Sequence, residues 1–480
     1  MLCAFLVDFT DAFQATRTDG PDDNYADMYV WPAPGFERRD DKGERMVCKV
    51  NVGMQGRIDS TRLFSDRLWK ILNKGGMSRA LWDPQLGIYH NSVNPDADKS
   101  LLQVLTELKG ATDSKPQQPP VGYAVIGWHV DDGTGVACDV NHELDVKKNR
   151  VLQYLNGLIQ VTYATKLTGW HGHKALGYSI TCDDRRERVT LDAPDALAQV
   201  SAMLLEGTAT ITPKHIMTSD FDEIPAGVVP DVGDPLRDKV LAEMELTRRG
   251  LGFWIWLYNA YPKATAPTNM LCANMAYPSA LTLKNLRFMT MHVLRYPEGA
   301  SYGGWGTVGL EQPEELIPPF TPGKKAMYFH YFSDANLRDR SLTGGIGMLA
   351  GGPIHVVCQR QHLKGPDSHT VEVVAAGNNC NNIVAQNGLL QELRIRLGQP
   401  TPLYLDSKTT VFVALNDTAV KKSVWLTRRV AVLQDAARQN EITPIHIPER
   451  DMVADPFTKY LPYAVWDRHM KYLLNRIPDE

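Results

Sequence analysis

The residues best placed to do chemistry are acids that follow apolar, strand-like runs. Asp131 and Asp132 lie between the apolar stretches 124–130 and 134–137, with Gly133 directly after them, which predicts a tight hairpin with the acids at its tip. Two carboxylates pressed against apolar strands repel each other and lose solvent, so a divalent cation is the usual remedy. The Asp-Asp pairs at residues 22, 40 and 183 lack such flanks and are typical of solvated loops.

A third acid, Asp8, comes at the end of another apolar run, residues 2–7. If the two runs are adjacent strands, three aspartates meet at one place. Such a set would hold two Mg²⁺ ions about 4 Å apart, the arrangement that stabilises both the attacking and the leaving oxygen in phosphoryl transfer. The first part of the chain therefore predicts a two-metal site.

Four more acids are spread through the last third of the chain. Asp334 ends a strand-like run, Glu372 lies early in a long helical segment, Asp406 follows the run 403–405, and Asp455 begins the last predicted helix. Each one alone is typical of a helix cap or a surface charge. Because they are far apart in sequence, only the folded chain could bring them together.

The elements that must position these acids are mixed. Strands are predicted at 2–7 and 121–130 and a helix at 61–72, and residues 193–295 read as mostly helical, most clearly at 280–294. A stretch rich in Pro and Gly, 297–323, marks a domain boundary. After it come strands at 326–332 and within 344–359, a helix at 370–397, a strand at 401–405, a helix at 423–438, a strand at 442–447 and a helix from 454. This order predicts a mixed α/β layer.

Composition limits the possible classes of protein. The chain has 480 residues, 43% of them hydrophobic, and a formal net charge of −4, which excludes a disordered chain and a whole-chain basic excess. The apolar stretch 251–261 is too short to cross a membrane, so no membrane partner is expected. The seven cysteines are scattered, which argues against a disulfide framework or a zinc site and favours a reducing, intracellular compartment.

The first acid cluster resembles a known family. Residues 8–13, Asp-Phe-Thr-Asp-Ala-Phe, resemble the D-V-x-x-A-F motif of Copia-type (pseudovirus) LTR-retrotransposon reverse transcriptases, and residues 129–132, His-Val-Asp-Asp, resemble their Y-V-D-D motif. Residues 54–64 and 291–299 are similar to further stretches of that family. The resemblance implies that Asp8, Asp131 and Asp132 bind the metal ions of a polymerase. It also implies that Phe13 is the aromatic gate under the sugar of an incoming dNTP, although a core phenylalanine is equally compatible.

The second acid cluster matches the ribonuclease H region of the same family. Residues 332–336 resemble its V-D-A-D motif, 341–345 its S-T-S-G, 368–372 its S-T-E-A-E, 404–407 its L-C-D-N and 453–459 its L-A-D-I-L-T-K. The resemblance implies a metal-binding set of Asp334, Glu372, Asp406 and Asp455. Two departures are visible: Thr370 replaces the first glutamate of S-T-E-A-E, and the histidine of the family's K-H-I-D motif is missing around 423–426. The basic residues Lys421, Lys422, Arg428 and Arg429 could touch a phosphate backbone, though a solvated helix face is the simpler interpretation.

Together these observations predict an α/β (α+β) fold with three domains. Residues 1–192 would form a palm-like antiparallel sheet with helices, 193–323 a helical thumb or connection with a linker, and 324–470 a ribonuclease H-like mixed sheet with helices. Only seven residues precede Asp8, so we expect the family's fingers region to be absent from the Pol fragment and primer extension to be very weak or absent.

The resemblance also implies a function and partners. The expected activities are RNA-directed DNA synthesis and cleavage of RNA in RNA–DNA hybrids, with two Mg²⁺ or Mn²⁺ ions in each active site. The expected partners are RNA–DNA hybrid, template-primer, dNTPs and the rest of a Pol polyprotein, in the cytoplasm, within a virus-like particle, or in the nucleus, with an oligomer possible. The alternative is an inactive retroelement remnant that only binds nucleic acid or protein.

Overall fold

The computed structural model describes residues 3–10, 29–30, 39–42, 44, 46–49, 60–91, 103, 119–129, 132–160, 164–169, 174–183, 188–208, 211–222, 224–304, 310, 312–362, 364–395, 400–416 and 424–476. The chain folds as two compact units. Unit 1 comprises residues 1–170 with Glu392–Arg394, and unit 2 comprises residues 171–391 and 395–480. The three-domain division at residues 192 and 323 stays a prediction.

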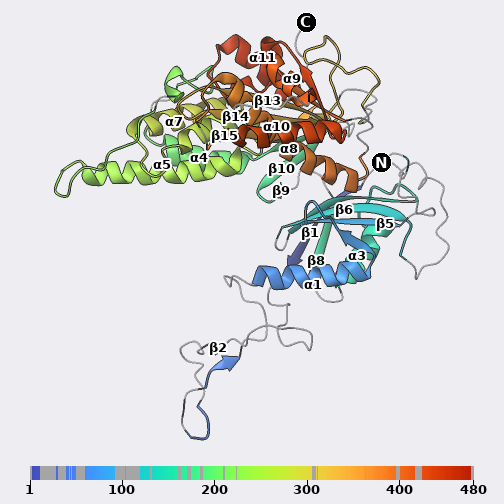
Figure 1. The fold of residues 1–480 in the computed structure, drawn as a ribbon. Helices are drawn as coiled ribbons and strands as arrows, with labels where there is room; N and C mark the ends of the chain where they lie inside the picture. Colours follow the sequence, from blue (N-terminus) through green and yellow to red (C-terminus); the bar gives the residue numbers. More distant parts are fainter. Residues whose placement is uncertain are drawn as a thin grey trace. The chain divides into compact units, whose positions relative to one another are not determined.

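Unit 1 is built on a six-stranded antiparallel sheet (Figure 1). Its strands, in spatial order, are β4 (Met77–Arg79), β5 (Leu86–Asn91), β6 (Gly122–His129), β7 (Asp132–Asp139), β1 (Cys3–Thr10) and β8 (Ala164–Gly169). Helices α1 (Ser60–Lys74) and α3 (Arg150–Gln160) pack on this sheet, and β2 (Tyr29–Val30) pairs with β3 (Cys48–Lys49).

The core of unit 1 follows from helical and strand periodicity. Leu68 and Leu72 are four residues apart on α1, so they share one face of the helix, and both are buried. Val7 and Phe9 are two residues apart on β1 and lie in the same core, because alternate strand residues face one side of a sheet. The helix predicted at 61–72 and the strand predicted at 121–130 are confirmed as α1 and β6.

Unit 2 begins with a small sheet and four helices. The antiparallel sheet has the order β12-β11-β10-β9, with strands β9 (Lys174–Ala175), β10 (Tyr178–Cys182), β11 (Arg188–Asp192) and β12 (Ala300–Gly303). Between β11 and β12 come α4 (Pro194–Leu205), α5 (Arg237–Leu257), α6 (Thr265–Cys272) and α7 (Ala280–Arg295), with short 3₁₀ turns η1 (Ser219–Asp222) and η2 (Pro262–Ala264). Helices α4, α5 and α7 pack against one another.

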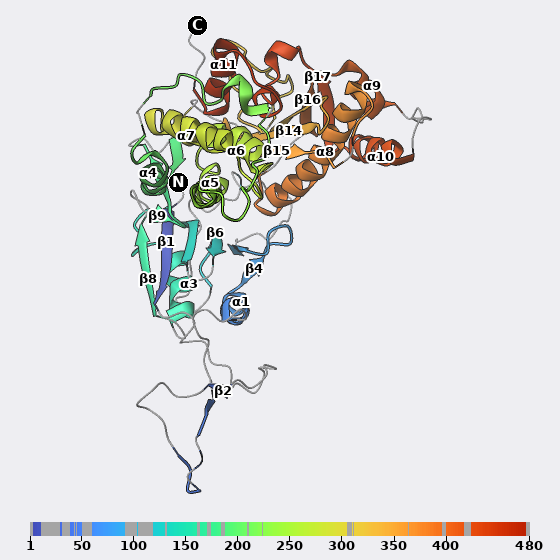
Figure 2. The same cartoon turned by 90° about the vertical axis from the view of Figure 1, so that its left-hand side faces the viewer.

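The larger sheet of unit 2 has five strands in the order β15-β14-β13-β16-β17. Strands β13 (His330–Asn336), β14 (Leu342–Leu349) and β15 (Gly352–Arg360) are antiparallel, whereas β16 (Thr401–Leu405) and β17 (Ile442–His446) run parallel to β13. The helices are α8 (Ser368–Glu392), α9 (Lys408–Leu415), α10 (Val424–Arg438) and α11 (Tyr463–Leu473), with 3₁₀ turns η3 (Glu449–Asp451) and η4 (Asp455–Phe457). Figure 2 shows α8, α9 and α10 on one side of this region.

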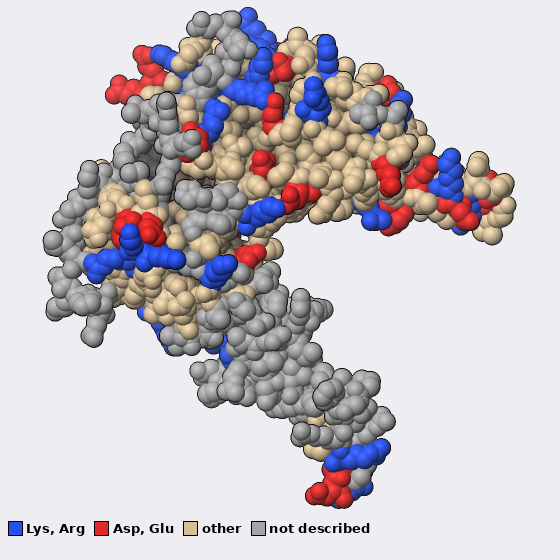
Figure 3. All heavy atoms as spheres, turned by 180° about the vertical axis from the view of Figure 1, so that it is seen from behind, with Lys and Arg blue, Asp and Glu red and all other residues tan. Residues whose placement is uncertain are grey.

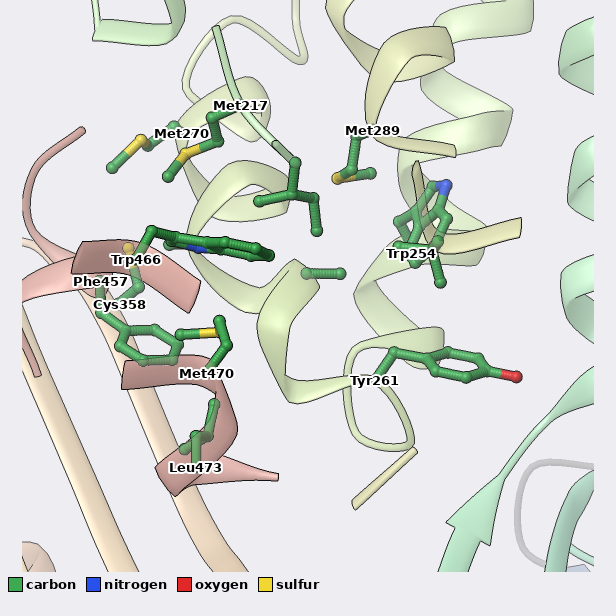
Figure 4. Packing of buried hydrophobic residues seen from close by; sticks show 14 of the residues in the cluster. Met217, Trp254, Tyr261, Met270, Met289, Cys358, Phe457, Trp466, Met470 and Leu473 are labelled. Atoms are coloured by element: carbon green, nitrogen blue, oxygen red, sulfur yellow. The ribbon is translucent and has the colours of Figure 1, made fainter. Parts of the chain in front are cut away.

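Both faces of the five-stranded sheet are covered. One face of the sheet, with Tyr331, Leu403 and Leu405, shares a core with α8, α9 and α10. The other face, with the alternating neighbours Phe332 and Tyr404, shares a core with α11 and with α4–α7, which we call the helical segment. Figure 4 shows Trp466 of α11 between Met217 and Met270 on one side and Phe457 and Met470 on the other. One apolar core therefore joins α4–α7 to the five-stranded sheet, which explains why this sheet is so deeply buried.

The structure differs from the sequence prediction at two helices. The last helix was expected from 454, but Asp455 lies in the 3₁₀ turn η4 and α11 begins at Tyr463. Pro456 at the start of η4 and Pro462 before α11 separate the two elements. Helix α9 was not predicted. The α/β (α+β) fold class is confirmed, and none of the described helices combines the length and apolar character that a membrane crossing requires.

The joint core predicts a large stability effect at Trp254. This side chain is fully buried on α5, and its indole Nε1 donates to Thr290 Oγ1 of α7 at 3.0 Å. Trp254→Ala should lower the free energy of unfolding by about 3–5 kcal/mol, since it leaves a cavity and removes the donor to the Thr290 hydroxyl, which keeps only its own bond to the Leu286 carbonyl. The neighbouring Ile255 is 39% exposed, so Ile255→Ala is a matched control expected to cost under about 1 kcal/mol. Equal losses in urea unfolding of the two variants would contradict the described core.

Candidate active site

Three carboxylates of unit 2 meet at one end of the five-stranded sheet. Strands β13 and β16 are parallel neighbours, with Phe332 opposite Tyr404. Asp334, within β13, and Asp406, directly after β16, each lie two residues further along. Glu372 comes from the first turns of α8. One oxygen of each of these three carboxylates lies within 4.8 Å of the other two. The predicted convergence of these three acids is therefore present.

The fourth predicted acid, Asp455, lies beside this group in η4 and is 3% exposed. Its turn is tied to β13 because Thr458 Oγ1 donates to Asp334 Oδ2. Lys459 Nζ lies 3.1 Å from Asp455 Oδ2. A Cβ at Gly344 of β14 would lie 2.7 Å from Thr458 Cγ2, so glycine is needed there for the turn to approach the sheet. Among the described residues, Asp455 does not join the 4.8 Å group.

The pKa values of the four acids reflect burial first and the neighbouring charges second. Burial, reinforced by the charges of Asp455 and Asp406, raises the pKa of Asp334 well above its usual range. Burial and the charges of Asp334 and Asp406 do the same to the pKa of Glu372. Burial raises the pKa of Asp406, and it raises the pKa of Asp455 to about 6 although Lys459 opposes the shift. Without a compensating cation, the ionised cluster is therefore unfavourable.

The donor set suits a divalent metal. Glu372 Oε2 and Asp455 Oδ1 are buried and have no hydrogen-bond partner within the part of the chain that the structure describes. A buried carboxylate oxygen without a partner is costly, and a cation removes that cost. Mg²⁺ and Mn²⁺ prefer hard carboxylate oxygens, which are the ligands present here. These residues thus fit the ions that the sequence predicts.

The acids of unit 1 are described only in part. In the backbone register of the antiparallel pair β1 and β7, Asp8 lies directly opposite Asp132. His129 pairs with Asp132 across the β6–β7 hairpin, and the Asp132 side chain is exposed. Asp131 and Phe13 lie outside the described residues, so their predicted roles stay predictions. The register brings two of the three aspartates predicted for the polymerase site to adjacent strands.

Sequence reasoning assigned no role to Thr458 and Lys459, which contact Asp334 and Asp455. It also assigned none to Glu449, whose carboxylate lies 3.4 Å from Lys459 Nζ. The only sequence signal was the Thr-Lys pair at the end of the 453–459 motif. Of the predicted basic cluster, Arg428 and Arg429 lie on α10, and Lys421 and Lys422 fall outside the described residues.

Comparison with known proteins gives structural similarity only. No family model matches the chain, and no curated protein matches its sequence. A foamy viral protease-reverse transcriptase in complex with RNA/DNA hybrid has 12% identity and a TM-score of 0.43, over 96% of this chain and 45% of that one. LC11-RNase H1 from compost has 14% identity and a TM-score of 0.23, over 27% of this chain and 91% of that one. The N-terminal RNase H domain of a Mycobacterium tuberculosis protein has 14% identity and a TM-score of 0.22, over 30% of this chain and 97% of that one. The chain thus spans about half the length of that foamy viral chain.

The crowded acids predict that removing one charge stabilises the metal-free protein. When folding raises the pKa of a carboxyl, that group lowers the free energy of unfolding at high pH. The loss grows as the pH rises from about 4, the pKa in the unfolded chain, to the pKa in the folded protein. Asp334→Asn keeps an acceptor for the Thr458 hydroxyl but removes the charge, so it should raise the free energy of unfolding at pH 8 in EDTA. Thermal unfolding at pH 8 and pH 5 tests this: the gain should shrink at pH 5. A loss of stability at pH 8 would contradict the described repulsion.

Proposed function

We propose that residues 324–470, within unit 2, form a ribonuclease H that cleaves the RNA strand of RNA–DNA hybrids. The observation that carries this proposal is the meeting of Asp334, Glu372 and Asp406, with Asp455 beside them, at the end of β13 and β16. Two Mg²⁺ or Mn²⁺ ions held by these four acids would activate a water molecule and stabilise charge on the leaving oxygen. The same order of four acids in the sequence motifs supports the proposal independently.

The residues themselves would act as rigid holders. Asp334 and Asp406 extend from paired strands, and the hydroxyl of Thr458 fixes one oxygen of Asp334, so little reorganisation is needed when the ions and the scissile phosphate bind. Selectivity for the hybrid would come from 2′-hydroxyl contacts across a wide, shallow minor groove. On the face seen in Figure 3, Lys and Arg side chains are interspersed with Asp and Glu. Because the chain has a formal net charge of −4, the backbone of the hybrid would be held by local basic groups.

We further propose the setting that the sequence motifs imply. The chain would be part of the Pol polyprotein of a Copia-type LTR retrotransposon and would work in the cytoplasm, inside a virus-like particle, or in the nucleus. Unit 1 would be the palm of the reverse transcriptase, binding template-primer and dNTPs. The observation favouring this second activity is the register that sets Asp8 opposite Asp132.

The nuclease proposal predicts a simple activity. The full chain with Mg²⁺ or Mn²⁺ should cleave the RNA of a labelled RNA–DNA hybrid and leave duplex DNA intact. Asp406→Asn should reduce the rate at least about 10³-fold while the fold is retained, because the amide keeps the volume but removes a charged ligand. As a matched control, Asp435→Asn, on the exposed surface of α10, should cleave like the unsubstituted chain. Undiminished cleavage by Asp406→Asn would show that the cleavage comes from another nuclease, which would contradict the proposed site. No cleavage by the folded, unsubstituted chain would favour an inactive remnant that only binds.

The palm proposal is tested separately by primer extension on an RNA template. Any dNTP incorporation by the chain should disappear in Asp132→Asn and persist in Asp435→Asn, since only the first change removes a proposed metal ligand. Hybrid cleavage should be unaffected by Asp132→Asn. Incorporation that survives Asp132→Asn would rule out the proposed palm site.

A further inference from the structure

Lys459 occupies a distinctive place next to the proposed nuclease site. It follows η4, and its ammonium lies 3.1 Å from Asp455 Oδ2 and 3.4 Å from Glu449 Oε1. The side chain of Asp455 is 5% exposed, that of Lys459 is 31% exposed, and that of Glu449 is 76% exposed. The lysine therefore bridges a buried carboxylate and a solvated one.

The four acids differ in how their charge is balanced. Oxygens of Asp334, Glu372 and Asp406 lie within 4.8 Å of one another and form a group into which a cation fits. Asp455 lies outside that group; one of its oxygens is paired with Lys459, and the other is buried without a hydrogen-bond partner among the described residues. The Lys459 ammonium is thus paired with the Asp455 carboxylate, which a second metal ion would use as a ligand.

Charge balance makes this position consequential. Two divalent ions supply four positive charges, which match the four carboxylates. An ammonium kept among them would leave an unbalanced positive charge at short range from a divalent ion, which is strongly unfavourable in a partly buried site. If the ammonium moves toward Glu449, which it already contacts, its charge remains paired.

We propose that Lys459 is a resident counter-cation of Asp455 that the second divalent ion must displace, and that Glu449 takes over the displaced ammonium. This inference rests on the proposed function, because it needs Asp455 to be a metal ligand. Lys459 is then a positioning residue. It holds Asp455 in place in the metal-free protein and makes the second ion bind more weakly than the first.

The test counts Mn²⁺ ions bound to the full chain by calorimetry and by electron paramagnetic resonance of free Mn²⁺. The unsubstituted chain should bind one ion more tightly than a second. Lys459→Gln should lower the Kd of the second ion about tenfold or more, since no ion pair has to be broken. The Kd of the first ion should stay within about threefold of its value in the unsubstituted chain. Lys459→Arg keeps the charge and should behave like the unsubstituted chain. Glu449→Gln, an exposed change, should weaken the second ion by a few fold. Circular dichroism of each variant without Mn²⁺ checks folding.

The outcomes separate this inference from the function beneath it. If the unsubstituted chain binds two ions and Lys459→Gln binds the second no more tightly, the displacement is wrong while the nuclease proposal stands. If Glu449→Gln leaves the second ion unchanged, the role of Glu449 as acceptor is wrong. If the unsubstituted chain binds no Mn²⁺, the proposed function fails and this inference fails with it.

Discussion

The loss of solvent and the mutual repulsion of four neighbouring carboxylates are the constraint on which the rest of unit 2 depends. Asp334 and Asp455 are almost fully buried, and Glu372 and Asp406 are partly so, yet Lys459 is the one cation that the described contacts place against any of them. Such a cluster is stable only if something else holds it together. The folding free energy of the surrounding core must offset the cost of bringing like charges together. Bound cations would remove this repulsion, so the repulsion itself favours cation binding.

The scaffold that resists this repulsion is a sheet covered on both faces. Tyr331 faces the core shared with α8 and α10, and its neighbour Phe332 faces the core shared with α11 and the helical segment. Strands β13 and β16 are thereby fixed in register, so Asp334 within β13 and Asp406 directly after β16 have little freedom to separate. Asn379 adds a polar tie, since its Nδ2 donates to Ser333 Oγ and to the Gly344 carbonyl at 2.9 Å. The helical segment thus contributes to the site by packing, although it supplies none of the four acids.

Much of this arrangement could be predicted from the sequence, and the exceptions have physical causes. The strand-like runs before Asp334 and Asp406 and the long helix carrying Glu372 were visible because periodicity and apolar runs are local signals. Helix α9 was missed because Thr409, Thr410, Val411 and Val413 are β-branched, a composition that favours strands, whereas Ser407 caps the segment as a helix. The contact of Lys459 with Glu449 and the pairing of β11 with β12 depend on the tertiary fold. Neither hydrophobic periodicity nor a short motif predicts such contacts.

The central claim is that the Asp334, Glu372 and Asp406 carboxylates form a metal site of a nuclease that acts on RNA–DNA hybrids. The most direct measurement is anomalous diffraction from crystals of the full chain grown with Mn²⁺ and a non-cleavable hybrid. The account predicts an anomalous peak within coordination distance of all three carboxylates, with the scissile phosphate of the RNA strand beside it. Ordered carboxylates with no Mn²⁺ between them, or a hybrid bound elsewhere on the chain, would contradict it.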